Sequence, residues 1–154
     1  MKKKVYLSSL IFVIIDLISK IIIMSFYKDS ITVIDKFFYI EKATNTGAAF
    51  SILTGGRILF IIIAILVLFY ICKYMIKDVN NKTEVISISM LIGGIIGNLI
   101  DRVVYGKVID FLSLRFGSYN FPVFNLADVF ITVGIFILLI SSIRGGKDGN
   151  KSNW

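Results

Sequence analysis

Two aspartates, Asp110 and Asp128, have the residue type and spacing for acid-base chemistry. Asp110 lies in "VIDF" just beyond one apolar run and Asp128 in "FNLAD" at the start of the next, so the segment 111–127 returns the chain to the same place. Two carboxyls held close together cannot both ionise, so one stays an acid while the other acts as a base. Such a pair can activate water against an amide and protonate the leaving amine.

The residue types that are missing exclude several kinds of catalytic site. The chain has no histidine, which removes Ser-His and Cys-His nucleophilic pairs and the H-E-x-x-H zinc site. Its one cysteine, Cys72, permits no internal disulfide and no cysteine metal cluster, and we expect it to be a small buried apolar residue. Proton transfer therefore falls to Asp, Glu, Lys or Tyr, and we expect no metal and no cofactor.

The composition is that of a membrane protein. Of the 154 residues 56% are hydrophobic, the mean hydropathy is +0.85 and there is one proline. Four apolar runs reach the roughly 20 residues that a helix needs to cross a bilayer. We expect an all-α polytopic protein with one integral membrane domain over 1–154. Its spans are predicted at 5–26, 57–76, 84–103 and 124–143, with extracytoplasmic segments at 27–56 and 104–123.

The cations indicate the orientation. Segments 1–4, 73–84 and 144–154 hold nine lysines and arginines in 27 positions, whereas 27–57 and 102–124 hold seven in 54. The positive-inside rule then places both termini in the cytoplasm. The net charge of +7 is mainly a topology signal, with attraction to membrane lipids second, and we expect no nucleic-acid partner.

The segment after the first span has a different pattern. Residues 30–52 are rich in β-branched and aromatic types and partly alternate, which predicts a small β-sheet platform outside the membrane. Between the second and third spans, "KDVNNKTE" predicts a tight polar turn in which Thr83 caps the next helix.

Polar residues inside the spans share one depth. At about 1.5 Å per residue, Lys20, Asn98 and Asp128 lie about 22, 21 and 22 Å from the inner ends of their helices. Residues three or four apart share a helix face. Three sets of residues have this spacing. They are Asp16 and Lys20, then Gly94, Asn98 and Arg102, and finally Asn125 and Asp128. We therefore expect three polar faces to meet in the outer part of the bilayer.

Two interpretations of these faces remain open. Asp16 and Lys20 fit either helix packing or function. The remaining polar residues favour a functional cavity, because ionisable groups inside a membrane usually line one. Asp101 points about 100° away from Arg102 on the same helix and is expected to be a helix-end or structural partner.

Two other protein classes share some of these features. An ion-coupled carrier also places charged residues inside a bundle, but usually near mid-membrane and with repeats or broken helices, and no repeat is present. A structural membrane subunit can use polar faces as interhelical contacts, but this class gives no role to Asp110. Loss of catalysis on changing Asp110 distinguishes an enzyme from both.

Five sequence blocks, in this order, resemble the signature blocks of the prolipoprotein signal peptidases, the signal peptidase II family. They are "DLISK" (16–20), "NTGAAFS" (45–51), "GGIIGNLIDR" (93–102), "VIDF" (108–111) and "FNLAD" (124–128). A single block means little, but the ordered set is specific. Position 109 is isoleucine where valine is common, which is a conservative difference.

The resemblance implies an aspartic endopeptidase of the bacterial cytoplasmic membrane that cleaves the signal peptide from diacylglyceryl-modified prolipoproteins just before the lipidated cysteine. It implies that Asp110 and Asp128 are catalytic, that 31–56 forms a small sheet that cradles the substrate, and that the enzyme works as a monomer. It also implies a set of substrate-binding residues, with Asp16 and Lys20 supporting the cleft: Asn45, Gly94, Asn98, Arg102, Asn125, Asp16 and Lys20.

Overall fold

A computed structural model describes residues 1–26, 30–47 and 56–148 of the chain, with side chains described up to residue 143. Its helices are α1 (Lys2–Ser25), α2 (Arg57–Lys73), a 3-10 turn (Met75–Asp78), α3 (Lys82–Val104) and α4 (Leu126–Asp148). Its strands are β1 (Ser30–Ile34), β2 (Phe38–Asn45), β3 (Val108–Phe116) and β4 (Tyr119–Asn120).

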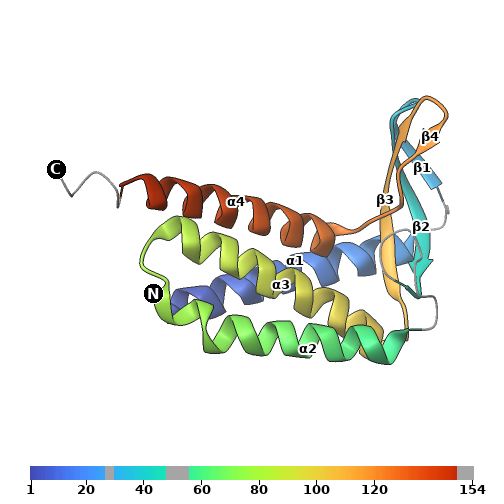
Figure 1. Cartoon of the computed structure of the whole chain (residues 1–154). Coiled ribbons are helices and arrows are strands. Elements are labelled where there is room, and N and C mark those ends of the chain that lie inside the picture. The colour runs from blue at the N-terminus through green and yellow to red at the C-terminus, as the bar shows by residue number, and fades with distance from the viewer. Residues whose placement is uncertain (27–29, 48–55, 149–154) are drawn as a thin grey trace.

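Four long helices form a bundle in the described part of the chain, and the sheet stands across one end of it (Figure 1). All four are long and apolar enough to cross a membrane. The N-terminal end of α1 and the C-terminal end of α4 lie at the opposite end of the bundle (Figure 1). The predicted fold class, a four-helix membrane protein with a small sheet, is confirmed.

The sheet is larger than the sequence predicted. Its strands are antiparallel in the order β1-β2-β3-β4, and only β1 and β2 come from the predicted platform. β3 and β4 come from the segment between α3 and α4, whose strands the sequence analysis did not identify. Residues 48–55 of the predicted platform lie outside the described residues.

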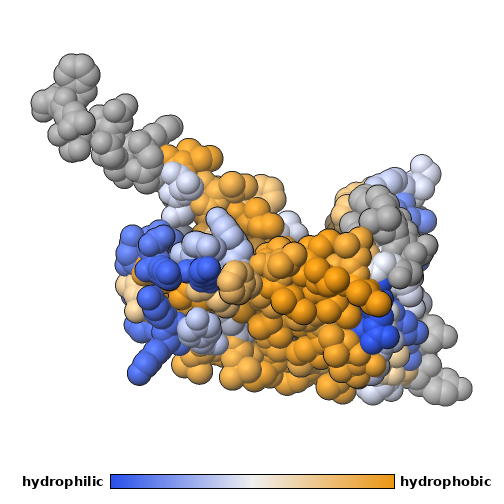
Figure 2. Space-filling model, turned by 60° about the horizontal axis from the view of Figure 1, so that its bottom comes forward, coloured by the Kyte–Doolittle hydropathy of each residue, from blue (hydrophilic) through white to orange (hydrophobic). Residues whose placement is uncertain are grey.

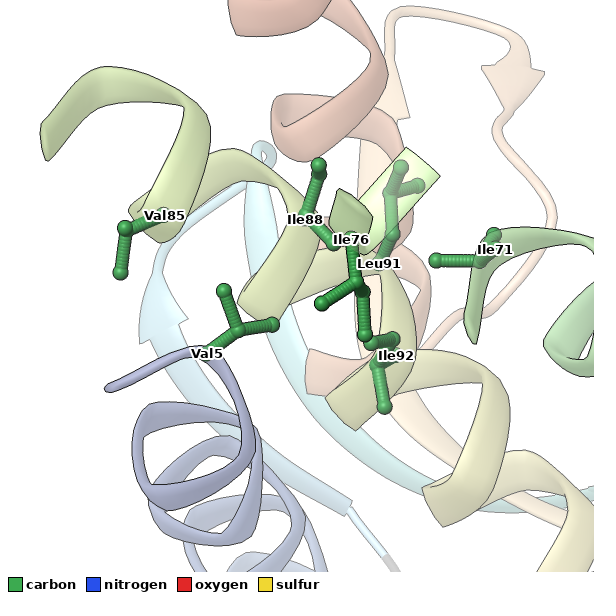
Figure 3. Packing of buried hydrophobic residues seen from close by; sticks show 7 residues of the cluster. All are labelled: Val5, Ile71, Ile76, Val85, Ile88, Leu91 and Ile92. Carbon is green, nitrogen blue, oxygen red and sulfur yellow. The ribbon is translucent and has the colours of Figure 1, made fainter. Parts of the chain in front are cut away.

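α3 is the central helix and supplies four of the seven residues of the main core cluster. At the end away from the sheet, the core cluster joins α1, α2, the 3-10 turn and α3, with Val5, Ile71, Ile76, Val85, Ile88, Leu91 and Ile92 packed together (Figure 3). Apolar side chains of α2 and α4 are mostly exposed. On the face that comes forward from the bottom of Figure 1, where α2 lies, apolar residues form a broad band with hydrophilic residues at both of its ends (Figure 2), as a lipid-facing surface requires.

Two local predictions were wrong. Asn81, not Thr83, caps α3: its side chain accepts a hydrogen bond from the backbone N–H of Glu84 at 2.9 Å. Asparagine one residue before the helix satisfies a free N–H that a threonine inside the first turn does not. Cys72 is exposed rather than buried, because α2 contacts the bundle along a narrow strip and turns its other faces outward.

Glycines let α3 approach its neighbours closely. A Cβ on Gly94 would lie 2.4 Å from the carbonyl oxygen of Ala127 on α4, and a Cβ on Gly97 would lie 2.3 Å from a carboxyl oxygen of Asp16 on α1. Real atoms do not approach so closely, and the first of these neighbours is backbone. The lack of a side chain at Gly94 and Gly97 therefore permits the close packing of α3 against α4 and α1.

Replacing Gly94 by alanine is therefore expected to push α4 away from α3. Overpacking of this kind costs about 1–3 kcal/mol, so the thermal unfolding midpoint in detergent should fall. Val103→Ala, at an exposed position of the same helix, is the control and should change the midpoint little. Equal midpoints for the two variants would show that the α3–α4 contact tolerates an added methyl group.

Candidate active site

Five charged or amide side chains meet at a cavity of about 540 Å³ between the sheet and the sheet end of the bundle. They come from β2, α3, β3 and α4, and they are Asn45, Asn98, Arg102, Asp110 and Asp128. The rest of the wall is mostly apolar and is built by the segment 121–124, by residue 129 and residues 131–133 of α4, and by two residues of β3. The cavity therefore offers a few polar groups beside a long apolar surface.

Asp110 is a buried carboxyl on β3, directly opposite Ala43 of β2. The side-chain N–H of Asn125 donates to its Oδ1 at 2.6 Å, and the side chain of Asn45 is also hydrogen-bonded to it. Burial, and secondly the negative charge of Asp128, raise the pKa of Asp110 to about 6, while the two asparagines oppose the shift.

Asp128 is held at the start of α4 by a reciprocal pair of hydrogen bonds with Asn125. The backbone N–H of Asp128 donates to Asn125 Oδ1 at 3.0 Å, and the backbone N–H of Asn125 donates to Asp128 Oδ2 at 3.2 Å. This is the geometry of a capping box, in which the residue before the helix and the third residue inside it satisfy each other's N–H groups. Asn125 therefore contacts both carboxyls.

Asn98 links the pair of aspartates Asp110 and Asp128, here called the dyad, to the bundle interior. Its Nδ2 donates to Asp128 Oδ1 at 2.8 Å, and its Oδ1 accepts from Asn125 at 3.0 Å and from the Lys20 ammonium at 3.2 Å. These contacts fix which way the Asn98 amide faces, because the ammonium can only donate.

The Lys20 ammonium lies between two buried carboxylates. It is 2.7 Å from Asp16 Oδ2 on its own helix and 2.9 Å from Asp101 Oδ2 on α3. Asp16 Oδ1 accepts from the backbone N–H of Ala127 at 2.9 Å, and Asp101 Oδ2 accepts from that of Ile109 at 3.0 Å. Ala127 precedes Asp128 and Ile109 precedes Asp110, so this ionic cluster fixes the backbone immediately before each dyad aspartate.

Arg102 lies on the cavity wall and ties α3 to its surroundings. Its guanidinium donates to the carbonyl oxygens of Gly47 at 3.2 Å and Asn98 at 3.4 Å, and it lies over the ring of Phe60 at 5.1 Å from the centroid. Its positive charge also acts on Asp110 and Asp128. Arg102 thus joins the end of β2, α2 and α3 beside the dyad.

The structure separates the nine predicted site residues into two groups. Asp110, Asp128, Asn45, Asn98 and Arg102 line the cavity. The other four lie behind the wall: Asn125, Asp16 and Lys20 are buried and hydrogen-bonded to protein groups, and Gly94 contacts α4. Asp101, predicted to be a structural partner, is confirmed as one.

The apolar wall of the cavity was missed by the sequence analysis. Its members include Leu114, Phe121, Pro122 and Val133. In a chain that is more than half apolar, such residues carry no signal that separates a cavity wall from a lipid-facing surface. Residues 48–51 of the predicted "NTGAAFS" block lie outside the described residues. Among the residues the structure does describe, no three His, Cys, Asp or Glu side chains cluster as metal ligands do.

Comparisons with known proteins show similarity over most of the chain. The model of the family described as signal peptidase (SPase) II matches residues 8–144. A lipoprotein signal peptidase of Staphylococcus carnosus is 39% identical over 149 residues, covering 92% of this chain and 94% of its own, and one of Bacillus pumilus is 36% identical over 150 residues, covering 96% and 97%. A solved structure titled as a bacterial membrane enzyme at 2.3 Å superposes with a TM-score of 0.85 at 37% identity, covering 97% of this chain and 92% of that one.

The ionic cluster yields a stability prediction. Lys20→Met removes the cation and leaves two carboxylates buried without it, which is expected to cost about 3–5 kcal/mol. Thermal unfolding in detergent measures the loss. Lys3→Met, at an exposed position of the same helix, is the matched control. Similar midpoints for the two variants would contradict the structural role of Lys20.

Proposed function

The chain belongs to the signal peptidase II family, and on this premise we propose that Asp110 and Asp128 are the catalytic pair with which it cleaves signal peptides from prolipoproteins. Members of the family are aspartic-type peptidases of bacterial membranes. The observation that carries the assignment is that, in the described part of the chain, Asp110 and Asp128 are the two carboxyls on the cavity wall. Both carboxyls accept a hydrogen bond from Asn125.

In the proposed mechanism Asp110 starts as the acid and Asp128 as the base. The raised pKa of Asp110, about 6, favours its protonated form. Asp128 lies in the first turn of α4, where the helix dipole favours negative charge. Asp128 takes a proton from water as the water oxygen attacks the scissile carbonyl, and Asp110 donates its proton to the carbonyl oxygen.

Collapse of the resulting tetrahedral diol completes the cycle. The C–N bond breaks, the departing amine takes the proton held by Asp128, and one diol hydroxyl returns a proton to Asp110. The two aspartates regain their starting forms without a covalent intermediate. Their neighbours Asn45, Asn98 and Arg102 are proposed to orient the substrate backbone at the cavity wall.

The apolar wall supports a lipid-modified substrate. We propose that the diacylglyceryl group next to the scissile bond lies against this wall, because each buried CH₂ contributes about 0.8 kcal/mol.

The first prediction from the proposed function concerns the dyad. Asp110→Asn and Asp128→Asn should each lower the cleavage rate by about 10²–10⁴-fold or more, because each removes one half of the proton exchange. The assay follows release of the signal peptide from a diacylglyceryl-modified prolipoprotein by the purified enzyme. Asp35→Asn, at an exposed position of the β1–β2 turn, is the control and should keep full activity. Near-normal turnover by either dyad variant would overturn the assignment.

The second prediction concerns pH. Asp110 must be protonated to act as the acid, so kcat/KM should fall as the pH rises through its pKa of about 6. Isotope-edited infrared spectra of the carboxyl stretch measure the same ionisation directly. In Asp128→Asn the negative neighbour is gone, so the Asp110 transition should move to lower pH. A transition that stays in place or moves upward would disprove the coupling.

The third prediction concerns orientation. We propose that both termini are cytoplasmic, which the lysine distribution supports and which agrees with both helix ends lying opposite the sheet (Figure 1). Reporters fused after Asn80 and after the C-terminus should read as cytoplasmic, and one inserted at Asp35 as external. The reverse pattern would place the cavity on the cytoplasmic side.

A further inference from the structure

α2 has little buried surface at the end that lies beside the sheet. Of its residues, Arg57–Lys73, only Ile71 is buried, and Ile71 lies toward the other end of the helix. Phe60 comes eleven residues earlier, about 17 Å along the helix axis. Because α2 begins beside the sheet (Figure 1), its first turns are held in place by contacts other than core packing.

Two contacts attach this end of α2 to the last turn of α3. The Arg57 guanidinium donates to the carbonyl oxygen of Val103 at 2.8 Å, and the guanidinium carbon of Arg102 lies 5.1 Å from the centroid of the Phe60 ring. Arg57 and Phe60 are three residues apart and so share a face of α2, while Arg102 and Val103 are adjacent on α3. One face of α2 therefore meets one turn of α3, and Phe60 supplies the ring in that contact.

The Arg102 guanidinium has few other partners. It donates to the carbonyl oxygen of Gly47 at 3.2 Å and to that of Asn98 at 3.4 Å, and the second distance is long for an N–H···O hydrogen bond. These two bonds use two of its five N–H groups. Within the described ranges 1–26, 30–47 and 56–143 the remaining N–H groups have no protein partner, so they are available to a bound substrate.

We propose that Phe60 is a positioning residue for the reaction: its ring fixes the Arg102 guanidinium at the cavity wall, so that the remaining N–H groups meet the substrate backbone. The face of an aromatic ring attracts a guanidinium within about 6 Å of its centroid, and the attraction is stronger away from water. Phe60 is not among the described residues that line the cavity, so it acts through Arg102 rather than on the substrate. The inference rests on the proposed function, in which Arg102 orients that backbone.

The alternative interpretation of Phe60 is an ordinary lipid-facing apolar residue. Its neighbours on α2 are of that kind, since Ile58 and Leu59 are 72% and 46% exposed. Phe60 is half-buried and differs from them in its contact with a cation. Leucine keeps the apolar bulk and removes the electrostatic attraction of the ring. The two interpretations therefore predict different activities for Phe60→Leu.

The same substitution elsewhere on α2 provides a matched control. The Lys73 ammonium lies 5.1 Å from the centroid of the Phe69 ring, the same separation as at Phe60, but at the end of the helix away from the cavity. F60L and F69L therefore each remove one ring from one cation on the same helix. Cleavage of a diacylglyceryl-modified prolipoprotein is measured for both purified enzymes, together with their thermal unfolding midpoints in detergent.

F60L is expected to lower kcat about tenfold, which corresponds to the loss of a partly desolvated cation–π contact. KM should change little, because the apolar wall of the cavity is intact in this variant. F60Y and F60W keep an aromatic ring and should retain most of the activity, and F69L should retain all of it. Equal losses in F60L and F69L, or an equal loss in F60L, F60Y and F60W, would overturn the proposal.

Nuclear magnetic resonance measures the position of the guanidinium independently of catalysis. Protons over an aromatic face resonate upfield, so the Arg102 Nε–H signal of enzyme with isotope-labelled arginine should move downfield in F60L and stay in place in F69L. Arg102→Lys identifies the signal by removing it. An unmoved signal in F60L, or a moved signal with unchanged cleavage, would refute the positioning role. If Asp110→Asn kept its activity while F60L lost activity, the dyad assignment would fail and the role of Phe60 would stand.

Discussion

The ion cluster of Lys20 with Asp16 and Asp101 is the interaction on which the site depends. Each carboxylate uses one oxygen for the ammonium, and each also accepts the backbone N–H that precedes a dyad aspartate. α1 carries no catalytic residue, yet through Lys20 it fixes where β3 meets α3 and where α4 begins. Because removing one partner of a buried ion pair leaves an uncompensated charge, this arrangement resists displacement.

Asparagines transmit that constraint to the catalytic carboxyls. Asn98 receives the ammonium on its oxygen and donates to Asp128, while Asn125 donates to Asp110 and caps α4. Amides suit this position because they both donate and accept without adding charge. The two carboxyls therefore have different environments. Asp110 is enclosed by the sheet and has a raised pKa, whereas Asp128 lies at a helix N-terminus and lines the cavity. In the proposed mechanism, acid and base are thereby distinguished by position rather than by residue type.

Sequence reasoning recovered what depends on local pattern and missed what depends on pairing. Apolar runs predicted the membrane helices, and the common depth of Lys20, Asn98 and Asp128 predicted that their helices meet. β3 was missed because its partner β2 lies on the far side of two membrane helices, so no short-range pattern announces it. Likewise, polarity at the right depth does not reveal whether a side chain lines the cavity, as that of Asn98 does, or lies behind its wall, as that of Asn125 does.

The pairing of β2 with β3 also has a consequence for biogenesis. Between these strands the chain crosses α2 and α3, so the ladder cannot close until that helical hairpin has inserted. Before then β1 and β2 form an isolated two-stranded hairpin, which is marginally stable in water. Asp110 arrives with β3 and Asp128 only with the last helix. A partly inserted chain consequently lacks the assembled pair of aspartates, and the cavity that they line is complete only once the final helix is in place.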